Sequence, residues 1–121
     1  LGTTHADYFF GSIPCITQPT SNEVDKDYEK FTGLRIVNHF HTLGINSLEV
    51  PAALVQGHGV FCWGKTVKDA LENSIIVEKV AEMAIHTLSL NQKSKLSEYI
   101  LNKHFLRKHG KNKYYGQENR D

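Results

Sequence analysis

Long apolar runs, a charge excess and a dense set of cysteines are all missing from this sequence of 121 residues. No apolar stretch approaches the roughly 20 residues needed to cross a bilayer, so the sequence predicts no membrane-spanning helix. Fourteen Lys and Arg against 13 Asp and Glu give a net charge of +1, which predicts no general attraction to nucleic acid or membranes. The opening LGTTHADYFF has neither an initiator methionine nor a signal-peptide pattern, and it predicts a chain that begins inside a domain.

Only two cysteines are present, Cys15 and Cys62, and they lie far apart among apolar neighbours. Two are too few for a disulfide framework, which favours a reducing, cytoplasmic location. We expect Cys62, within VFCWG, to behave as a small buried hydrophobic residue. A hydrophobic content of 40% and a charged content of 22% are ordinary for a folded protein, and the length suits one domain or part of one.

The first third of the chain predicts short strands followed by helices. Residues 1–13 carry Thr, Tyr, Phe and Ile in loose alternation, which predicts one or two short strands. Thr20 followed by Glu23 fits a capping box, so a short helix is expected from Ser21. A second helix is expected over residues 32–43, where apolar side chains recur near helical spacing and a glycine follows as a stop.

The rest of the chain mixes β and α signals. Two buried strand segments, or one strand broken by a tight turn, are expected at 52–56 and 60–63, because Gly57-His58-Gly59 interrupts an apolar run. The longest helix is expected over residues 67–89, and another from Ser94 to the glycine at 110. Strands mixed with helices predict an α/β or α+β chain, and the lack of regular βαβ spacing argues against a simple Rossmann fold.

Seven histidines raise the possibility of a metal site. His58 is flanked by glycines at the end of an apolar strand, so it is either a ligand or an ordinary structural histidine. One histidine cannot hold a divalent ion, and at least two more ligands must come from elsewhere. His39 and His41 lie two apart in a predicted helix and therefore point to different faces. No HExxH or CxxC pattern occurs.

The segment TTHADY, residues 3–8, gathers hydroxyls, an imidazole and a carboxylate. In a strand, His5 and Asp7 would share one face. Asp7 would act there as a general acid or base near a metal or a sugar. The alternative is a polar loop at the surface of the domain.

The run LNKHFLRKHGKNKYYGQ, residues 101–117, mixes basic and aromatic side chains. Its cations complement the dipole at a helix C-terminus, which needs no function. Alternatives are a phosphate-binding patch, an arm that completes a neighbour's site, or a nucleic-acid contact, although the near-neutral charge of the chain disfavours the last. Because Tyr114 and Tyr115 are too aromatic for a plain disordered tail, we expect at least one of them to pack or to act.

Three segments together resemble one family: GTTHADYFFGSIPC, HGVFCWGKTVKDALENSIIVEKVA and LNKHFLRKHGKNKYYGQ. In this order they look like the C-terminal half of the L-ribulose-5-phosphate 4-epimerases, members of the class II aldolase/epimerase superfamily. The resemblance implies an α/β fold, a three-layer α/β/α sandwich with a mostly antiparallel central sheet. Residues 1–121 would form the C-terminal portion of one such domain. The family's enzymes are homotetramers whose active sites lie between subunits.

The resemblance also implies a metal site. Family members hold zinc, or another divalent metal, with three histidines. Two of these stand in an H-x-H motif of the N-terminal half, and the third matches His58. The family usually has HGPF here, and this sequence has HGVF, so Val60 replaces a proline with its fixed φ and leaves the histidine in place.

By the same resemblance, Asp7 of HADY and Tyr115 of YYGQ match the two proton-transfer groups, which reach a neighbouring subunit's metal. The family motif KHxLRKHG matches residues 103–110 and implies that His104 and Arg107 lie near the phosphate end of the substrate.

The implied function is metal-dependent epimerisation of L-ribulose 5-phosphate to D-xylulose 5-phosphate at C4, by cleavage and re-formation of the C3–C4 bond. Such an enzyme would serve carbohydrate metabolism, in arabinose catabolism or in ascorbate use. The 121 residues alone, without the N-terminal half, are expected to be inactive. One alternative is a class II aldolase of the fuculose or rhamnulose phosphate type. Another is a non-catalytic interaction module with the same fold.

Overall fold

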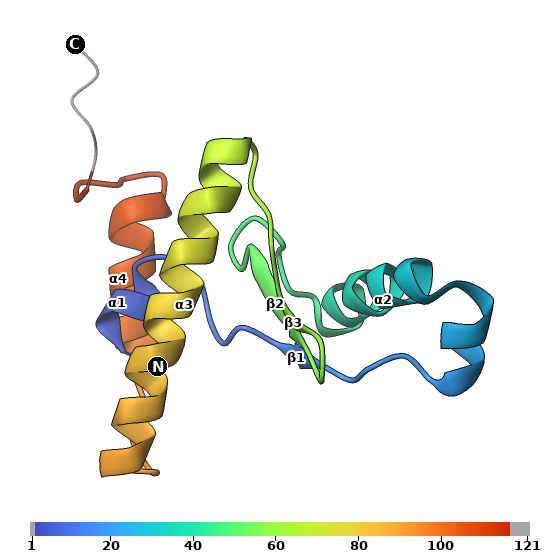
Figure 1. Ribbon diagram of the computed structural model, residues 1–121. Helices are drawn as coiled ribbons and strands as arrows, with labels where there is room; N and C mark the ends of the chain where they lie inside the picture. The colour runs from blue at the N-terminus through green and yellow to red at the C-terminus, as the bar shows by residue number, and fades with distance from the viewer. Residues whose placement is uncertain (1, 117–121) are drawn as a thin grey trace. The chain divides into compact units, whose positions relative to one another are not determined.

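The computed structural model of the chain describes residues 2–116 and contains both helices and strands (Figure 1). The chain forms two compact units: the first joins the residues up to Ser12 with those from Ile76 onward, and the second spans Ile13–Ile75. The mixed α/β class expected from the sequence is confirmed. The elements are, in order, α1 (Thr3–Ala6), β1 (Cys15–Ile16), α2 (Ser21–Leu43), β2 (Ala52–Val55), β3 (Gly59–Cys62), α3 (Val67–Leu90) and α4 (Glu98–His109).

The sheet of the second unit has three strands in the order β1-β2-β3. The two-residue strand β1 runs parallel to β2. The β2–β3 pairing is antiparallel and longer, with Ala52 opposite Cys62 and Val55 opposite Gly59. The two strand segments around a tight turn are therefore confirmed, but only β2 is largely buried: Val60 of β3 is 45% exposed, and Cys62 is half-buried rather than buried as expected, because β3 forms the edge of the sheet. The sheet is mixed, and its larger pairing is antiparallel.

An apolar core lies between this sheet and α2. Its members are buried aliphatic side chains together with one phenylalanine from the helix, and the Phe40 and Trp63 rings meet edge to face with their centroids 5.4 Å apart. Trp63 donates its indole N–H to the carbonyl of Ser47 at 2.8 Å, which satisfies the ring's only polar group. The core residues are Ile16, Phe40, Val50, Ala53 and Val55.

Helix α2 starts and stops where its sequence signals predict. Thr20 and Glu23 form the reciprocal capping box, and Gly44 ends the helix in the left-handed conformation at φ 63°. The two helices expected from the sequence form one element interrupted at Asp27, whose φ of −172° and ψ of 85° are not helical, so the second part begins before the expected residue 32. Asp27 accepts the backbone N–H of Lys30 at 3.2 Å, so it caps the second part of the helix. Figure 1 shows the turn before Asp27 set off from the rest of α2.

The prediction of strands in residues 1–13 is wrong. Residues Thr3–Ala6 form a helical turn, α1, closed by the bonds from the N–H of Ala6 to the carbonyl of Gly2 and from that of Asp7 to the carbonyl of Thr3. Ala6 and Phe9 are fully buried in the first unit, and α1 packs against α4. Tertiary packing thus overrides the β propensity of the segment, and His5 and Asp7 do not share a strand face.

The two C-terminal helices follow the sequence pattern more closely. Helix α3 spans Val67–Leu90, as predicted to within one residue. Helix α4 begins later than expected, because Ser97 rather than Ser94 is the N-cap, and it ends at Gly110 as predicted. Among residues 2–116, no helix is both long and apolar enough to span a membrane.

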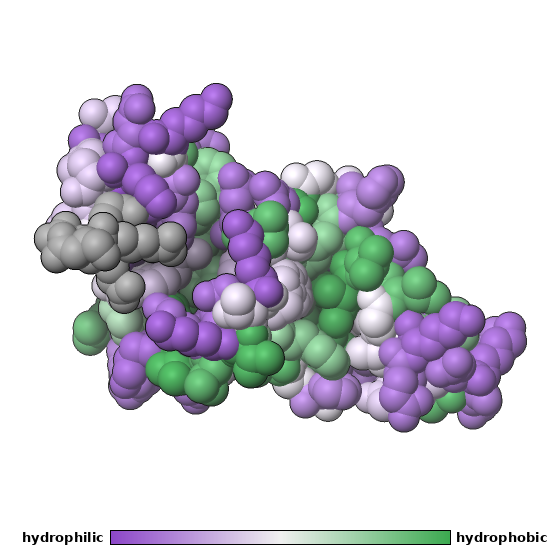
Figure 2. All heavy atoms as spheres, turned by 90° about the horizontal axis from the view of Figure 1, so that it is seen from above, coloured by the Kyte–Doolittle hydropathy of each residue, from purple (hydrophilic) through white to green (hydrophobic). Residues whose placement is uncertain are grey.

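Large apolar side chains remain exposed on both long helices. Figure 2 shows green hydrophobic groups among the purple polar ones on the face it presents. Val37 of α2 is 62% exposed and Ile75 of α3 is 63% exposed, alongside Leu34, Leu43, Leu71 and Ile85.

Candidate active site

The side chain of Asp7, at the C-terminus of α1, is bound by one face of α4. Arg107 donates to the Oδ1 atom from Nε at 3.3 Å and from Nη2 at 3.0 Å, and Nη2 also reaches Oδ2 at 3.2 Å. His104 Nδ1 lies 3.0 Å from the same Oδ1. The Asp7 side chain is only 14% exposed, so these charge-assisted bonds form in a partly water-excluded setting.

The spacing of residues on α4 explains this convergence. His104, Arg107 and Lys108 stand three and four positions apart, which places them on one side of a helix. Ser97 fixes the start of α4 by accepting the backbone N–H of Ile100 at 3.4 Å. Contact between α1 and α4 then brings the carboxylate of Asp7 to this basic side. Residues about one hundred positions apart in the sequence thereby become neighbours.

Tyr115 is connected to the same arginine. Its backbone N–H donates to the Arg107 carbonyl at 3.2 Å, and the Arg107 guanidinium carbon lies 4.1 Å from the centre of its ring. Tyr115 as a whole is 51% exposed. Arg107 therefore contacts both side chains that the family resemblance marks as proton-transfer groups. Tyr114 is also partly packed, with Lys103 Nζ 5.5 Å from its ring centre.

Sequence reasoning missed two basic residues of this cluster. Lys108 Nζ lies 3.8 Å from Asp7 Oδ2 and 4.6 Å from the centre of the Tyr8 ring. His109 Nε2 lies 2.8 Å from the backbone carbonyl oxygen of Asp7. The signal that could have found Lys108 is its position four residues after His104 on a predicted helix.

The histidine of HADY does not join the cluster through its ring. His5 Nε2 lies 2.7 Å from the Gly11 carbonyl oxygen, and the ring packs 5.3 Å from that of Phe9. Burial lowers the pKa of His5 below its usual value, with the Gly11 bond opposing that effect. A neutral imidazole that closes the 5–11 loop fits these contacts.

His58, the predicted metal ligand, lies in the second unit at the turn between β2 and β3. Its backbone N–H donates to the Val55 carbonyl at 3.0 Å and closes the turn. Gly57 and Gly59 have φ values of 72° and 138°, which residues with a Cβ rarely adopt. The exposed His58 ring packs beside Phe61, with 4.9 Å between centroids, and 6.3 Å from Tyr28.

A cavity of about 350 Å³ opens beside His58, within the second unit. One wall is the segment from Gln18 to Tyr28, and the other is the turn from Val55 to His58. The lining combines two amides, two hydroxyls, one carboxylate and the His58 ring with three apolar side chains, and no Lys or Arg among residues 2–116 belongs to it. Such a lining suits a small hydroxylated molecule better than a free phosphate group.

The described residues do not form a complete metal site. No group of three His, Cys, Asp or Glu side chains that could hold an ion is found within residues 2–116. His58 as a metal ligand, with further ligands from elsewhere, therefore stays a prediction.

Comparison with known proteins decides the family. Residues 1–85 match the domain described as "Class II Aldolase and Adducin N-terminal domain". The chain belongs to the class II aldolase family. That match covers Asp7 and His58, and the segment that holds α4 and Tyr115 lies beyond it.

Relatives of this class II aldolase chain carry a more specific name. The chain is 47% identical over 120 residues to proteins named L-ribulose-5-phosphate 4-epimerase UlaF from Salmonella paratyphi C, Salmonella choleraesuis and Salmonella paratyphi B. Each alignment covers 98% of this chain and 51% of the relative. The chain thus spans about half the length of the curated relatives it matches, and the similarity includes the α4–Tyr115 region.

Proposed function

We propose that this chain contributes part of the active site of an L-ribulose-5-phosphate 4-epimerase, which converts L-ribulose 5-phosphate to D-xylulose 5-phosphate. The observation that carries the proposal is the 47% identity over 98% of the chain to proteins of that name. The clustering of Asp7, His104, Arg107 and Tyr115 supports it, because proton-transfer and substrate-binding groups must converge to act on one substrate.

The substrate dictates the chemistry. The hydrogen on C4 is not acidic, because the carbonyl is at C2, so removing it directly would be very costly. Cleavage of C3–C4 avoids that step: a base takes the C4 hydroxyl proton, C4 becomes an aldehyde, and the bonding pair passes into an enediolate. Glycolaldehyde phosphate then turns over, the enediolate attacks its other face, and a proton returns to the C4 oxygen.

Two proton-transfer groups are needed, one for each face of the aldehyde. In the proposal, Asp7 serves one face and Tyr115 the other. His104 and Arg107 hold the Asp7 carboxylate, which supports placing them beside the substrate, where the family resemblance puts the phosphate end.

We propose that a divalent metal, zinc or another, would act as the Lewis acid that stabilises the charge of the enediolate. His58 would be one of its ligands, with the others on residues outside these 121. The proposed setting is a cytoplasmic homotetramer with sites between subunits, in which each complete domain is a three-layer α/β/α sandwich with a mostly antiparallel sheet. The exposed apolar side chains of α2 and α3 support such an assembly.

A chimera tests the activity. This chain replaces the matching segment of the Salmonella paratyphi C relative, and the product of L-ribulose 5-phosphate is identified. We expect D-xylulose 5-phosphate, and a loss of roughly 10²–10⁴-fold in kcat for Tyr115→Phe. Accumulating glycolaldehyde phosphate would indicate an aldolase instead, and a folded but inert chimera would indicate a non-catalytic module.

The chain alone provides the control. A polypeptide of only these 121 residues should be inactive and should bind zinc weakly, because it offers a single predicted ligand, His58. Tight, stoichiometric zinc binding by that polypeptide would contradict the proposed metal site.

A further inference from the structure

Arg35, which has no part in the proposed chemistry, hydrogen-bonds the segment that forms one wall of the cavity beside His58. The break at Asp27 separates Ser21–Lys26 from the rest of α2, so this short turn lacks the continuous backbone bonds that would make it rigid. Arg35 spans the break. Its Nε and Nη2 donate to Glu23 Oε2 at 3.1 and 2.6 Å, and its Nη1 donates to Thr17 Oγ1 at 3.0 Å.

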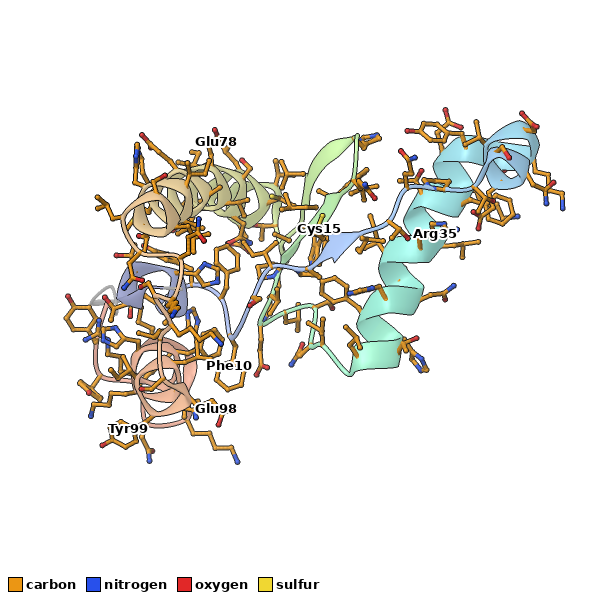
Figure 3. The ribbon with its side chains drawn as sticks, turned by 90° about the horizontal axis from the view of Figure 1, so that it is seen from below. Phe10, Cys15, Arg35, Glu78, Glu98 and Tyr99 are labelled. Carbon is orange, nitrogen blue, oxygen red and sulfur yellow. The ribbon has the colours of Figure 1, made fainter. Side chains whose placement is uncertain are left out.

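We propose that Arg35 is a positioning residue that fixes segment 18–28 as the wall of the His58 cavity and so sets the space open to a sugar. It ties the turn before the break and the loop after β1 to the long second part of α2. Figure 3 shows Arg35 on the side of α2 that faces the chain leading from β1 into the helix. The proposal rests on the proposed function only in naming a sugar as the occupant.

Contacts across the cavity make the wall's position matter. A Cβ added at Gly57 would lie 3.2 Å from Gln18 Oε1, so the wall closely approaches the turn that carries His58. Val24 and Asp25 of the short turn line the same cavity. If the turn swings away, the cavity widens beside His58, while the core around Trp63 keeps its own contacts.

The variants separate this role from helix capping. Arg35→Ala removes the hydrogen bonds to Glu23 and Thr17. Glu23→Gln removes the ion pair and keeps the capping box, because Gln serves at that position as well as Glu. Arg35→Lys restores the charge without the fork that reaches Glu23 and Thr17 together. Lys30→Ala is the matched control, since this cation lies on α2 and its ammonium group makes no hydrogen bond or ion pair within residues 2–116.

Amide NMR spectra of the chain give a readout that needs no activity. We expect Arg35→Ala to shift the Gly57 and His58 amide signals, Glu23→Gln to shift them in the same direction, and Arg35→Lys to restore them in part. The Trp63 indole N–H signal should stay in place, and Lys30→Ala should change none of these signals. In the active chimera, Arg35→Ala should raise KM more than it lowers kcat.

Unchanged Gly57 and His58 signals in folded Arg35→Ala would overturn the proposal, as would equal shifts in Lys30→Ala. If Arg35→Ala loses the Trp63 signal and is unfolded, the test passes to Glu23→Gln. Unchanged Gly57 and His58 signals in Glu23→Gln would then overturn the proposal. An inert chimera with the expected NMR shifts would refute the epimerase function alone.

Discussion

The substitution Asp7→Asn separates a structural from a purely catalytic carboxylate. Asp7 accepts three contacts of 3.0–3.3 Å from Arg107 and one of 3.0 Å from His104. Asn keeps the shape and one acceptor oxygen, but it loses the charge and turns an N–H₂ group toward cationic donors. The guanidinium would then be partly buried without its counter-charge, which is the unfavourable state in a broken ion pair.

The magnitude follows from burial and bond type. A hydrogen bond to a charged group contributes about 1.5–3 kcal/mol, and breaking a fully buried pair costs about 3–5 kcal/mol. The Asp7, Arg107 and His104 side chains are 14%, 20% and 21% exposed, so solvent screens part of this cost. We expect Asp7→Asn to lower the free energy of unfolding by about 2 kcal/mol, equivalent to a Tm lower by roughly 8 °C for a chain of this size.

Urea unfolding followed by far-UV circular dichroism measures the change. Asp25→Asn is the control, because the structure gives its exposed carboxylate no hydrogen bond or ion pair within residues 2–116, and we expect a change within about 0.5 kcal/mol. A double-mutant cycle with Arg107→Gln should return a coupling energy of about 1 kcal/mol or more. If Asp7→Asn is as stable as Asp25→Asn, the contacts on α4 do not hold the carboxylate and the reasoning fails.

Three further predictions concern the second unit. Phe40→Ala should lower the free energy of unfolding by about 3–5 kcal/mol and change the fluorescence of Trp63, because the two rings pack edge to face; an unchanged emission spectrum would contradict that packing. Gly57→Ala should cost about 1–2 kcal/mol, since its φ of 72° is left-handed, whereas Gly33→Ala in helical α2 should be neutral or stabilising in the same urea assay. The hydrogen bond from Arg35 lowers the pKa of Glu23 to about 2, below its unfolded value of 4.5. The ionised carboxylate therefore contributes fully to the free energy of unfolding above pH 4.5, and this contribution is lost as the pH falls toward 2. Glu23→Gln should therefore flatten the pH dependence of urea stability between pH 5 and about 2.5, and a curve parallel to that of the parent chain would argue against the ion pair.

Local signals predicted the elements that depend on local chemistry. Thr20 and Glu23 form their reciprocal bonds, Gly44 takes the left-handed conformation that stops α2, and the glycines around His58 make the turn of the hairpin. In each case, a side chain or the lack of one satisfies neighbouring backbone groups, and this information lies within a few residues.

Elements that depend on distant packing were not predictable in this way. Thr and Tyr in residues 1–13 favour strands, yet Thr3–Ala6 form a helical turn, and Ala6 and Phe9 are buried within the first unit. Two helices were expected here, but the second begins earlier than residue 32, because the Asp27 side chain accepts the N–H of Lys30 and caps it, which apolar periodicity does not reveal. Likewise, no local pattern pairs Asp7 with Arg107, and only family resemblance placed both residues in one site.

The two proposed proton-transfer groups differ in how firmly they are held, and the difference suits their task. The Asp7 carboxylate is fixed by several donors on α4 and is largely buried. Tyr115 is half exposed, and its ring stacks on the guanidinium of the same Arg107. In the proposed reaction, the aldehyde must turn over between its two proton exchanges. A firmly held acceptor on one face and a half-exposed tyrosine on the other would leave room for that rotation, and Arg107 contacts both groups. Arg107→Lys should therefore harm both halves of the reaction, since an ammonium group cannot fork to the carboxylate while stacking on the ring.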